Sequence, residues 1–281
     1  FFSSRRRHTR FRNVTGVQTC ALPIWPATNH FPLQPIAFPM KKFLMSAMMG
    51  MLCVFIGGVA SAQDKVSPPP SALLDYSIRA SIQGLSIEGN GSIEWQFSAN
   101  KYQLQFNTRT ALTGVLLSEK SEGSVERYGL QPSTFHSKRF RKEPVTVVFD
   151  RVAGSIYFPG DNPPLKIEGG EQDRISVLWQ LLSMARAAPA RFLPGSPWKF
   201  FVIGHRGGEP WIFTVESKQR LRTALGEVDS LHLIHLPAPN SGATRVDIWL
   251  APSLDWFPVR VRFSEPNGDS IEQSIANLKK G

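Results

Sequence analysis

Apolar and polar residues alternate with a period of two along much of the chain. The alternation is strict in residues 76–80, 93–97 and 102–106, and it returns in residues 259–263. A period of two is typical of antiparallel strands that have one buried face and one solvated face. Asn100-Lys101 is short enough to turn a hairpin between the second and third segments. Segments of this kind between turn-rich stretches predict roughly a dozen strands.

One segment changes its period to three and four. From Asp173 the chain reads DRISVLWQLLSMARAAP, in which Ile175, Leu178 and Leu182 fall on one helical face. The pattern predicts a helix over about residues 173–187, with Asp173 as its N-cap because a carboxylate accepts hydrogen bonds from free first-turn amides. The predicted fold class is mainly β (α+β): a single domain whose curved antiparallel sheet, similar to an incomplete barrel, packs on this one long helix.

The less regular segments give further expectations about where strands begin and end. We expect a bend or loop near Gly114, ahead of a strand at residues 123–128. A hairpin is expected to pair residues 145–149 with residues 155–158. Late in the chain, the segment Pro210 to Thr223 is expected to form two successive strands that separate after Glu216.

A segment with the features of a secretory signal peptide begins at Met40. Lys41-Lys42 form a positive n-region, residues 43–59 form an apolar region, and Ala60-Ser61-Ala62 gives a small-x-small cleavage pattern. We therefore predict cleavage after Ala62 and a periplasmic location, with an association with the outer membrane left open. The alternative is an uncleaved anchor, because roughly 18 apolar residues are just enough to span a bilayer.

The residues before Met40 are not interpreted as part of the functional protein. Residues 5–24, RRRHTRFRNVTGVQTCALPI, resemble a translated sequencing adapter, and we expect residues 1–39 to pack against nothing. The predicted division of the chain is an adapter-derived segment 1–24, upstream read-through 25–39, a signal peptide 40–62, a Pro/Ser linker 63–72 and a β-rich domain 73–281.

Removal of the first 62 residues changes the charge and the cysteine content. Seven of the 32 basic residues and none of the 22 acidic residues lie there, so the net charge falls from +10 to +3. A balance this mild gives no reason to expect a nucleic-acid partner. Cys20 and Cys53 also lie in this part, so the exported chain has no cysteine. Thiolate metal sites and a cysteine nucleophile are thereby excluded.

The residue types that carry catalysis have simpler explanations in this chain. His232 and His235 are three apart in a predicted strand, so they point to opposite faces of a half-wet surface and cannot chelate one metal. Glu119, Glu122 and Glu126 are interspersed with basic residues, as on a solvated face. No nucleophile elbow, P-loop or dinucleotide fingerprint occurs. We therefore assign no catalytic residue, metal or cofactor and predict that the protein is not an enzyme.

A basic run is the one cluster of charge. Lys138, Arg139, Arg141 and Lys142 surround Phe140 at the end of a predicted strand. One interpretation is an exposed strand end whose charges discourage edge pairing. The other is contact with anionic lipid head groups or lipopolysaccharide phosphates.

Six tryptophans remain in the exported chain, which is many for 219 residues. Most are expected in an ordinary core. If the sheet is incompletely closed, some of them can instead line an apolar groove, and the candidate groove residues are Trp95, Trp179, Trp249, Trp256 and Phe257.

Three groups of motifs stand out along the exported chain. They are EQDR at residues 171–174 with LWQL at 178–181, WLAP at 249–252 with PVRV at 258–261, and the early YSIRASIQGLSIEGNGSIEW. Together these motifs resemble the DUF3108 family of exported bacterial proteins. The resemblance spans about residues 73–278 and implies an envelope location in bacteria with two membranes. It implies no catalytic residues. In architecture, a curved sheet around a helix is also similar to the lipoprotein carriers and receptors of the Lol system, although a fold does not fix a function.

Three hypotheses follow for the function. The first is a non-enzymatic periplasmic protein that binds an apolar or amphipathic envelope component, lipid or lipoprotein-like, in a groove between sheet and helix. The second is a scaffold or interaction module of the envelope that has no ligand cavity. The third is an envelope hydrolase whose site is assembled from distant residues. The partner is accordingly an envelope lipid or an envelope protein, and the oligomeric state is left open.

Overall fold

The computed structural model describes residues 65–110, 114–238 and 244–281 of the chain. The predicted adapter segment, upstream read-through and signal peptide, including the cleavage site after Ala62, lie outside the described residues. Within these residues, no helix has the length and apolar character needed to cross a bilayer.

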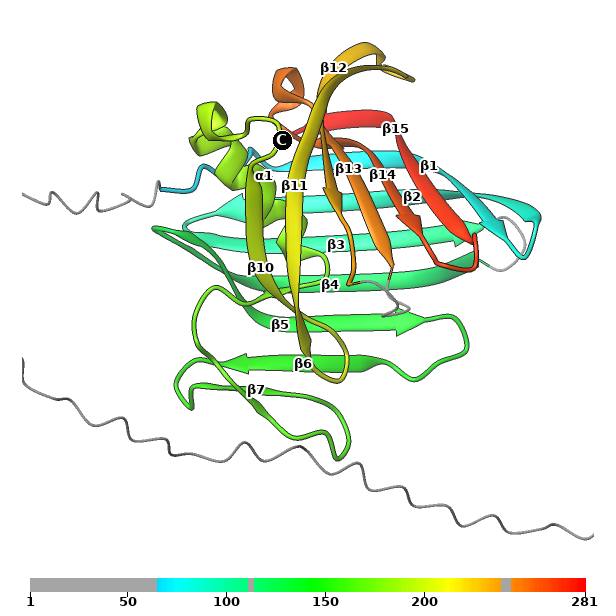
Figure 1. Ribbon diagram of the computed structural model, residues 1–281. Helices are drawn as coiled ribbons and strands as arrows, with labels where there is room; N and C mark the ends of the chain where they lie inside the picture. The colour runs from blue at the N-terminus through cyan, green and yellow to red at the C-terminus, as the bar shows by residue number, and fades with distance from the viewer. Residues whose placement is uncertain (1–64, 111–113, 239–243) are drawn as a thin grey trace, which may run out of the picture. The chain divides into compact units, whose positions relative to one another are not determined.

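In the described residues, fifteen strands form one curved sheet that does not close (Figure 1). The strands are β1 (Ala72–Ile82), β2 (Leu85–Ser98), β3 (Lys101–Thr110), β4 (Gly114–Glu126), β5 (Gly129–Arg139), β6 (Val145–Asp150), β7 (Ser155–Tyr157), β8 (Leu165–Lys166), β9 (Gln172–Asp173), β10 (Pro197–Ile203), β11 (Gly208–Thr223), β12 (Gly226–His235), β13 (Arg245–Leu250), β14 (Pro258–Ser264) and β15 (Ser270–Lys280). The prediction of a mainly β fold with one curved sheet is confirmed.

The order of the strands explains how the sheet is assembled. It runs β8-β7-β6-β5-β4-β3-β2-β1-β15-β14-β13-β12-β11-β10-β9. All neighbouring pairs are antiparallel except β9 and β10. The first and last strands pair with each other in the middle of the sheet, where Ile78 lies opposite Gln273 and the Gly281 amide donates to the Ser71 carbonyl at 2.8 Å. Two meanders are therefore joined through the ends of the domain, and β8 and β9 form its edges.

The predicted early hairpins have the expected geometry. β2 and β3 are joined at Ala99 and Asn100, whose φ values of 49° and 60° are those of a two-residue turn that needs left-handed residues. The predicted pairing of residues 145–149 with 155–158 is also present, as β6 with β7.

Two expectations about strand limits were wrong. Thr110 at the end of β3 lies opposite Gly114 in antiparallel pairing, so the chain reverses next to Gly114 as expected, but β4 begins at Gly114 and not at residue 123, and it runs without interruption to Glu126. β11 is one strand of 16 residues, where we expected two. Its pairing with β12 shifts register between Val215 and Ser217, so an irregularity absorbs the break in the alternation while the ladder continues.

The helix α1 (Ser176–Ala187) begins later than predicted and is followed by the 3-10 helix η1 (Pro189–Arg191). Asp173 is not the N-cap, which is Ile175. Asp173 pairs with Ile203 in the sheet and lies two residues before the cap, because the helix does not begin until Ser176. Its Oδ1 nevertheless accepts the amides of Ile175 at 3.0 Å and Ser176 at 2.8 Å, so the carboxylate still satisfies the first turn.

The start of the described chain is attached to the domain and is not a free tether. The Ser67 amide donates to the Ser183 carbonyl at 3.0 Å, and Arg186 Nε donates to the Ser67 carbonyl at 3.1 Å. The Pro69 carbonyl accepts the indole N–H of Trp95 at 3.1 Å. The predicted Pro/Ser linker is thus bound along α1 and β2 in its described part, because its backbone carbonyls satisfy buried donors.

The core forms on the inner faces of the strands and around α1. Leu74 and Tyr76 of β1 are buried, as are Trp179 and Leu181 of α1. The ring centroid of Trp179 lies 5.9 Å from that of Trp95 on β2. In Figure 1 the strands from β10 to β14 cross over those from β2 to β5, and α1 is seen between them. The two halves of the sheet thereby face each other.

Candidate functional site

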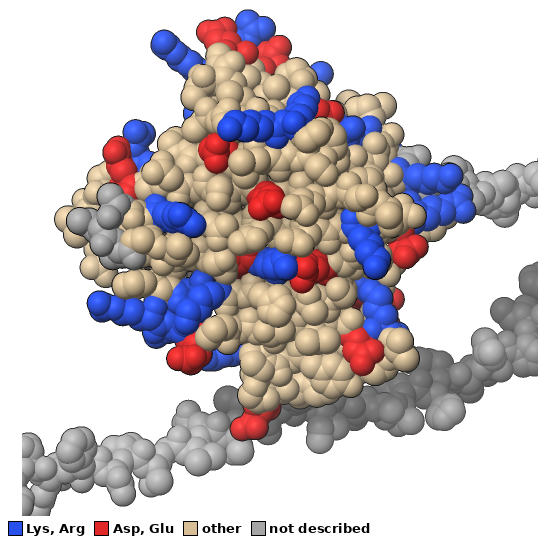
Figure 2. Space-filling model, turned by 180° about the vertical axis from the view of Figure 1, so that it is seen from behind, with Lys and Arg blue, Asp and Glu red and all other residues tan. Residues whose placement is uncertain are grey.

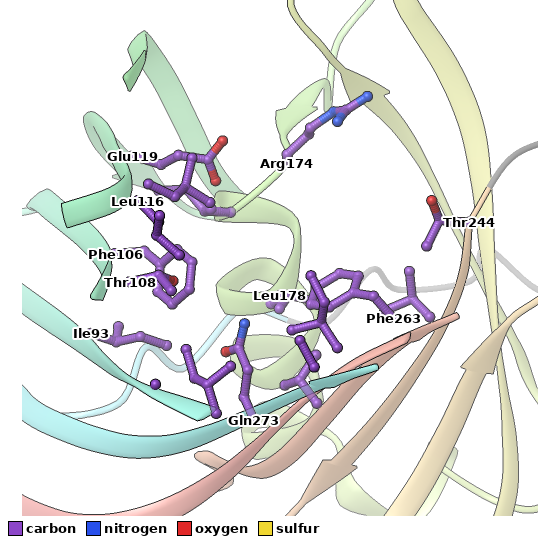
Figure 3. A pocket seen from close by; sticks show the side chains of 18 of the residues that line it. Ile93, Phe106, Thr108, Leu116, Glu119, Arg174, Leu178, Thr244, Phe263 and Gln273 are labelled. Atoms are coloured by element: carbon purple, nitrogen blue, oxygen red, sulfur yellow. The ribbon is translucent and has the colours of Figure 1, made fainter. Parts of the chain in front are cut away.

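A cavity of about 520 Å³ lies between the two halves of the sheet (Figure 3). One wall is formed by β1 to β4 and the other by β13 to β15, while α1, β5, β11 and β12 complete the lining. Drug-sized ligands occupy cavities of roughly 300–1,000 Å³. The space is therefore large enough for a substantial organic ligand.

The lining is mostly apolar because it is made of the inward positions of alternating strands. Ile93 and Phe106 line it from one wall and Val261 and Phe263 from the other, and Leu178 of α1 extends into it between them. These are the same positions that carry the period-two pattern in the sequence. Where the two halves of the sheet stand apart, the inward side chains line a space and do not fill it.

Gln273 is a buried polar side chain within this mostly apolar lining. Gln273 on β15 occupies an inward position between Ile271 and Ile275, and only 7% of its surface is exposed. Its side chain extends into the cavity (Figure 3). Within the described residues the amide makes no hydrogen bond with another side chain or backbone group. A buried amide without a partner is costly, so this position favours a polar group of a ligand or a water molecule beside it.

Charged side chains gather at one end of the cavity. Glu119 of β4 and Arg174, which precedes α1, both lie at this end (Figure 3), and Arg139 of β5 also lines the cavity. Glu119 is buried and accepts a hydrogen bond from Ser137 Oγ at 3.0 Å. Burial raises the pKa of Glu119, although the Ser137 bond and the guanidinium groups of Arg174 and Arg139 oppose the rise.

The expectation that Glu119 belongs to a solvated face with Glu122 and Glu126 was wrong. Glu119 and Ser121 share the inward face of β4, while Glu122 lies on the other side and pairs with Lys120 at 2.7 Å. The strand alternation decides this, because residues an odd number apart in a regular strand point to opposite faces.

A histidine joins the two arginines at this end. His205 Nδ1 lies 3.4 Å from Arg139 Nη2, and the ring stacks on Phe135. Burial, together with the positive charges of Arg139, Arg174 and Arg206, lowers the pKa of His205 to about 4. The imidazole is therefore neutral at neutral pH, with Nδ1 accepting from the guanidinium and the proton on Nε2.

A buried polar network lies behind the cavity wall. Asp173 Oδ2 accepts Ser121 Oγ at 2.5 Å, and Ser121 Oγ is 2.9 Å from Tyr102 Oη. Asp173 is fully buried, and this burial raises its pKa. With three hydrogen bonds to its carboxylate, Asp173 anchors β9 and the start of α1 against β4.

The predicted groove aromatics are dispersed, and only Trp179 lines the cavity. Trp95 is buried in the core, and Trp249 stacks on His232 at a centroid distance of 4.3 Å. Trp256 and Phe257 follow the 3-10 helix η2 (Pro252–Leu254) and lie outside the lining. The indole Nε1 of Trp179 is buried and has no hydrogen-bond partner within the described residues.

The predicted basic cluster is divided in a similar way. Arg139 lines the cavity, whereas Lys138, Arg141 and Lys142 do not. These three belong to the β5–β6 turn or its edge, where Lys138 Nζ donates to the Lys142 carbonyl at 2.7 Å. The turn lies at the right of Figure 1 and hence at the left of Figure 2, where Lys and Arg side chains gather.

The paired histidines of β12 were expected at a half-wet surface, and both are instead buried. His232 Nε2 lies 2.9 Å from Asp247 Oδ1, while His235 lines the cavity and stacks on Trp211. They lie on opposite faces, as predicted, but both faces of β12 are covered here. In the described part of the chain, no group of three His, Cys, Asp or Glu side chains could hold a metal ion.

Sequence reasoning missed Gln273, Arg174 and the inward position of Glu119. Gln273 gave a usable signal, because it occupies an apolar position in the alternation Ile271, Gln273, Ile275. Arg174 gave none, since its role depends on how α1 is placed against β10.

A family model described as "Protein of unknown function (DUF3108)" matches residues 75–275. A search of curated proteins finds no match.

Solved structures give distant similarities only. A DUF1329 family protein from Desulfovibrio piger is 9% identical, with 75% of this chain and 86% of that chain covered and a TM-score of 0.27. A protein from Bacteroides fragilis described as exported, with a YmcC-like fold, is 8% identical, with coverage of 77% and 100% and a TM-score of 0.34. A domain from Vibrio parahaemolyticus described as an outer membrane lipoprotein-sorting protein is 8% identical, with coverage of 75% and 85% and a TM-score of 0.25. Similarities of this size indicate no shared function.

Proposed function

We propose that this chain, which belongs to the DUF3108 family, is a non-enzymatic cell-envelope protein that binds the apolar part of a lipid or a lipoprotein-like molecule. The ligand lies in the cavity between the two halves of the sheet, against α1. The single observation that carries the proposal is the cavity of about 520 Å³ with its mostly apolar lining.

The cavity favours a ligand-binding function, because an empty cavity does not stabilise the fold. Empty apolar space lowers the free energy of unfolding, because its lining side chains lose packing contacts. The amide of Gln273 also faces the cavity without a hydrogen-bond partner in the described residues, and a bound ligand can supply one. A long apolar chain that carries a polar group along its length fills the empty space and gives the Gln273 amide a hydrogen-bond partner.

An envelope location is part of the proposal and rests on the sequence. The segment from Met40 to Ala62 has the charge, apolar length and small residues of a cleaved signal peptide. Envelope lipids and lipid-modified proteins are the apolar ligands that an exported protein meets in greatest amount.

The alternative, a scaffold with no ligand cavity, has weaker support. It is favoured by exposed apolar residues at the β1–β2 hairpin, where Leu85 is 68% exposed. A scaffold needs a closed core and an exposed docking edge. The mostly apolar cavity weighs against it.

Native mass spectrometry tests the proposal directly. The protein is expressed from Met40, purified from the exported fraction without detergent, and then extracted with organic solvent. We expect a chain that begins at Gln63 and carries an adduct of lipid mass. A chain that stays free of adducts after incubation with envelope lipids would contradict the binding function.

A matched pair of variants locates the bound molecule. Ala80 lines the cavity from β1, and its neighbour Ser81 is exposed on the opposite face. Ala80→Phe is expected to fill the space and remove the adduct, whereas Ser81→Phe should keep it. Equal adducts on both variants would place the lipid elsewhere.

A further inference from the structure

We propose that the cavity takes an amphiphile with an anionic head, a carboxylate or a phosphate, which Arg139 and Arg174 bind at the charged end while the chain occupies the apolar body. The inference rests on the proposed function and names the class of its ligand. It is carried by the position and surroundings of the two guanidinium groups.

The two arginines reach the cavity from separate parts of the fold. Arg139 is the last residue of β5, and Arg174 lies between β9 and α1. Both line the cavity, and both are exposed at its end. Within the described residues, neither guanidinium forms an ion pair with a carboxylate. Two cations that border an apolar space without a paired anion form a site for an oxyanion.

Arg174 has a defined place against the backbone. A Cβ atom added to Gly204 would lie 3.3 Å from both Nε and Nη2 of Arg174. The missing side chain of Gly204 therefore leaves the room in which the guanidinium lies, beside the β10–β11 turn. A planar guanidinium held in this way is prepared for bidentate contact with a carboxylate or a phosphate.

His205 helps to hold Arg139 in place behind the cavity lining. Its Nδ1 accepts from Arg139 Nη2, so the proton of the neutral ring is on Nε2. That Nε2 atom is buried and has no partner in the described part of the chain. His205 does not line the cavity, so it positions the Arg139 side chain and leaves contact with a head group to the two guanidinium groups.

Glu119 does not satisfy this cluster. It accepts the Ser137 hydroxyl at 3.0 Å and forms no ion pair with either arginine. Glu88, Glu209 and Glu265 also line the cavity, and none of these carboxylates forms an ion pair with Arg139 or Arg174 in the described residues. An anionic head can pair with the two guanidinium groups directly, whereas a neutral amphiphile cannot.

Three probes with the same chain length test the inference by isothermal titration calorimetry on the purified exported protein. Dodecanoate and dodecyl phosphate carry the anionic head, and dodecanol does not. We expect both anions to bind about tenfold to a hundredfold more tightly than dodecanol, as for hydrogen bonds to charged groups. The variant Arg139→Gln/Arg174→Gln should lose this preference and bind dodecanol as the wild type does. Arg222→Gln removes a charge outside the cavity lining and is the matched control.

The outcomes separate this inference from the function on which it rests. Binding of all three probes with equal affinity would overturn the anionic head and leave the cavity function intact. Absence of binding by all three would overturn both. Inorganic phosphate and acetate are tested alone, and binding as tight as that of the amphiphiles would overturn the amphiphile in favour of a free anion.

A variant that should gain affinity protects the test against loss of folding. Glu119→Gln removes a carboxylate at the charged end and can keep the bond to Ser137. We expect it to bind dodecanoate several times more tightly than the wild type, with dodecanol unchanged. Weaker binding of dodecanoate by this variant would contradict a head group placed at this end.

Discussion

Glu119 makes stability depend on pH in a direction that can be predicted. Burial raises its pKa above the ordinary value of 4.5, so the folded protein holds this proton more tightly than the unfolded chain. Its contribution is therefore complete below about pH 4.5 and is lost as the pH rises through the folded-state pKa. We expect Glu119→Gln to match the wild type near pH 4 and to become increasingly more stable toward pH 8, in urea unfolding followed by circular dichroism.

Glu122→Gln is the matched control for this experiment. Glu122 lies on the opposite face of β4, paired with Lys120, and is partly exposed. A rising advantage in both variants would mean that the effect comes from the net charge and not from the burial of Glu119.

Gln273 gives a second prediction at a single residue. Its amide is 7% exposed and has no partner within the described residues, so the folded protein retains the cost of removing it from water. Gln273→Leu is expected to raise the free energy of unfolding of the ligand-free protein by about 1 kcal/mol. Urea denaturation measures the change.

Gln219→Leu serves as the contrast. Gln219 Oε1 accepts the indole N–H of Trp249 at 2.8 Å, so the same substitution leaves a donor unsatisfied. We expect a loss of about 1–3 kcal/mol. A similar loss in Gln273→Leu would show that its amide has a partner after all.

Single residues also show which features of the site can be predicted from the sequence. The polar interruption at Gln273 is visible in the alternation, and so is the inward position of Glu119 once the register of β4 is known. The meeting of Arg139, Arg174 and His205 is not visible, because it joins β5, the start of α1 and the β10–β11 turn. Periodicity describes the neighbours within an element and contains nothing about contacts between distant elements.

The attachment of α1 to β5 is a contact between elements that can be measured as a coupling. Gln180 Oε1 accepts the Leu130 amide at 2.7 Å, and its amide nitrogen lies 3.3 Å from the Tyr128 carbonyl. A Cβ added to Gly129 would lie 2.6 Å from Gln180 Nε2. The glycine therefore allows the helix to approach the strand closely.

Gly129→Ala and Gln180→Ala are each expected to lower the free energy of unfolding by about 1–3 kcal/mol. The alanine at position 129 displaces the amide, and the alanine at position 180 removes it. In a double-mutant cycle, the combined loss should be smaller than the sum, because both changes break the same bonds. Additive losses would mean that the two residues act independently.

The sequence predicted the long elements and missed the shortest ones. The long alternating strands and the helix are found because many residues repeat one pattern. β8 and β9 contain two residues each and have no period to detect. The same limit explains Asp173. The sequence pattern predicts it as a helix cap, but it belongs to β9 and pairs with Ile203 of β10.

The cavity belongs to the scale of the whole domain. Most of the apolar lining side chains occupy inward positions that the sequence predicts as buried core, and the alternation cannot tell a filled interior from a hollow one. The difference arises from the curvature of 15 strands and from α1, which occupies only part of the space between them. The groove aromatics were therefore misplaced, since four of the five fill the core or the η2 region and only Trp179 borders the space.

The topology makes a last prediction about which strand the domain depends on most. β15 is the last strand in sequence but lies in the middle of the sheet, where Ser274 pairs with Ser77 of β1 and Arg260 of β14. β8 lies in the middle of the sequence but at an edge, where Lys166 pairs only with Ser155. Proline removes a ladder hydrogen bond and is tolerated mainly at edges.

We expect Ser274→Pro to lower the free energy of unfolding by about 3 kcal/mol or more and Lys166→Pro by less than about 1 kcal/mol. Ser274→Ala separates the loss of the hydroxyl from the loss of the backbone donor, and thermal unfolding of the three variants gives the comparison. A central β15 joins the two meanders into one sheet, so its disruption should also open the cavity and abolish binding of dodecanoate. Retained binding in a destabilised Ser274→Pro protein would show that each half of the sheet holds its part of the cavity without the other.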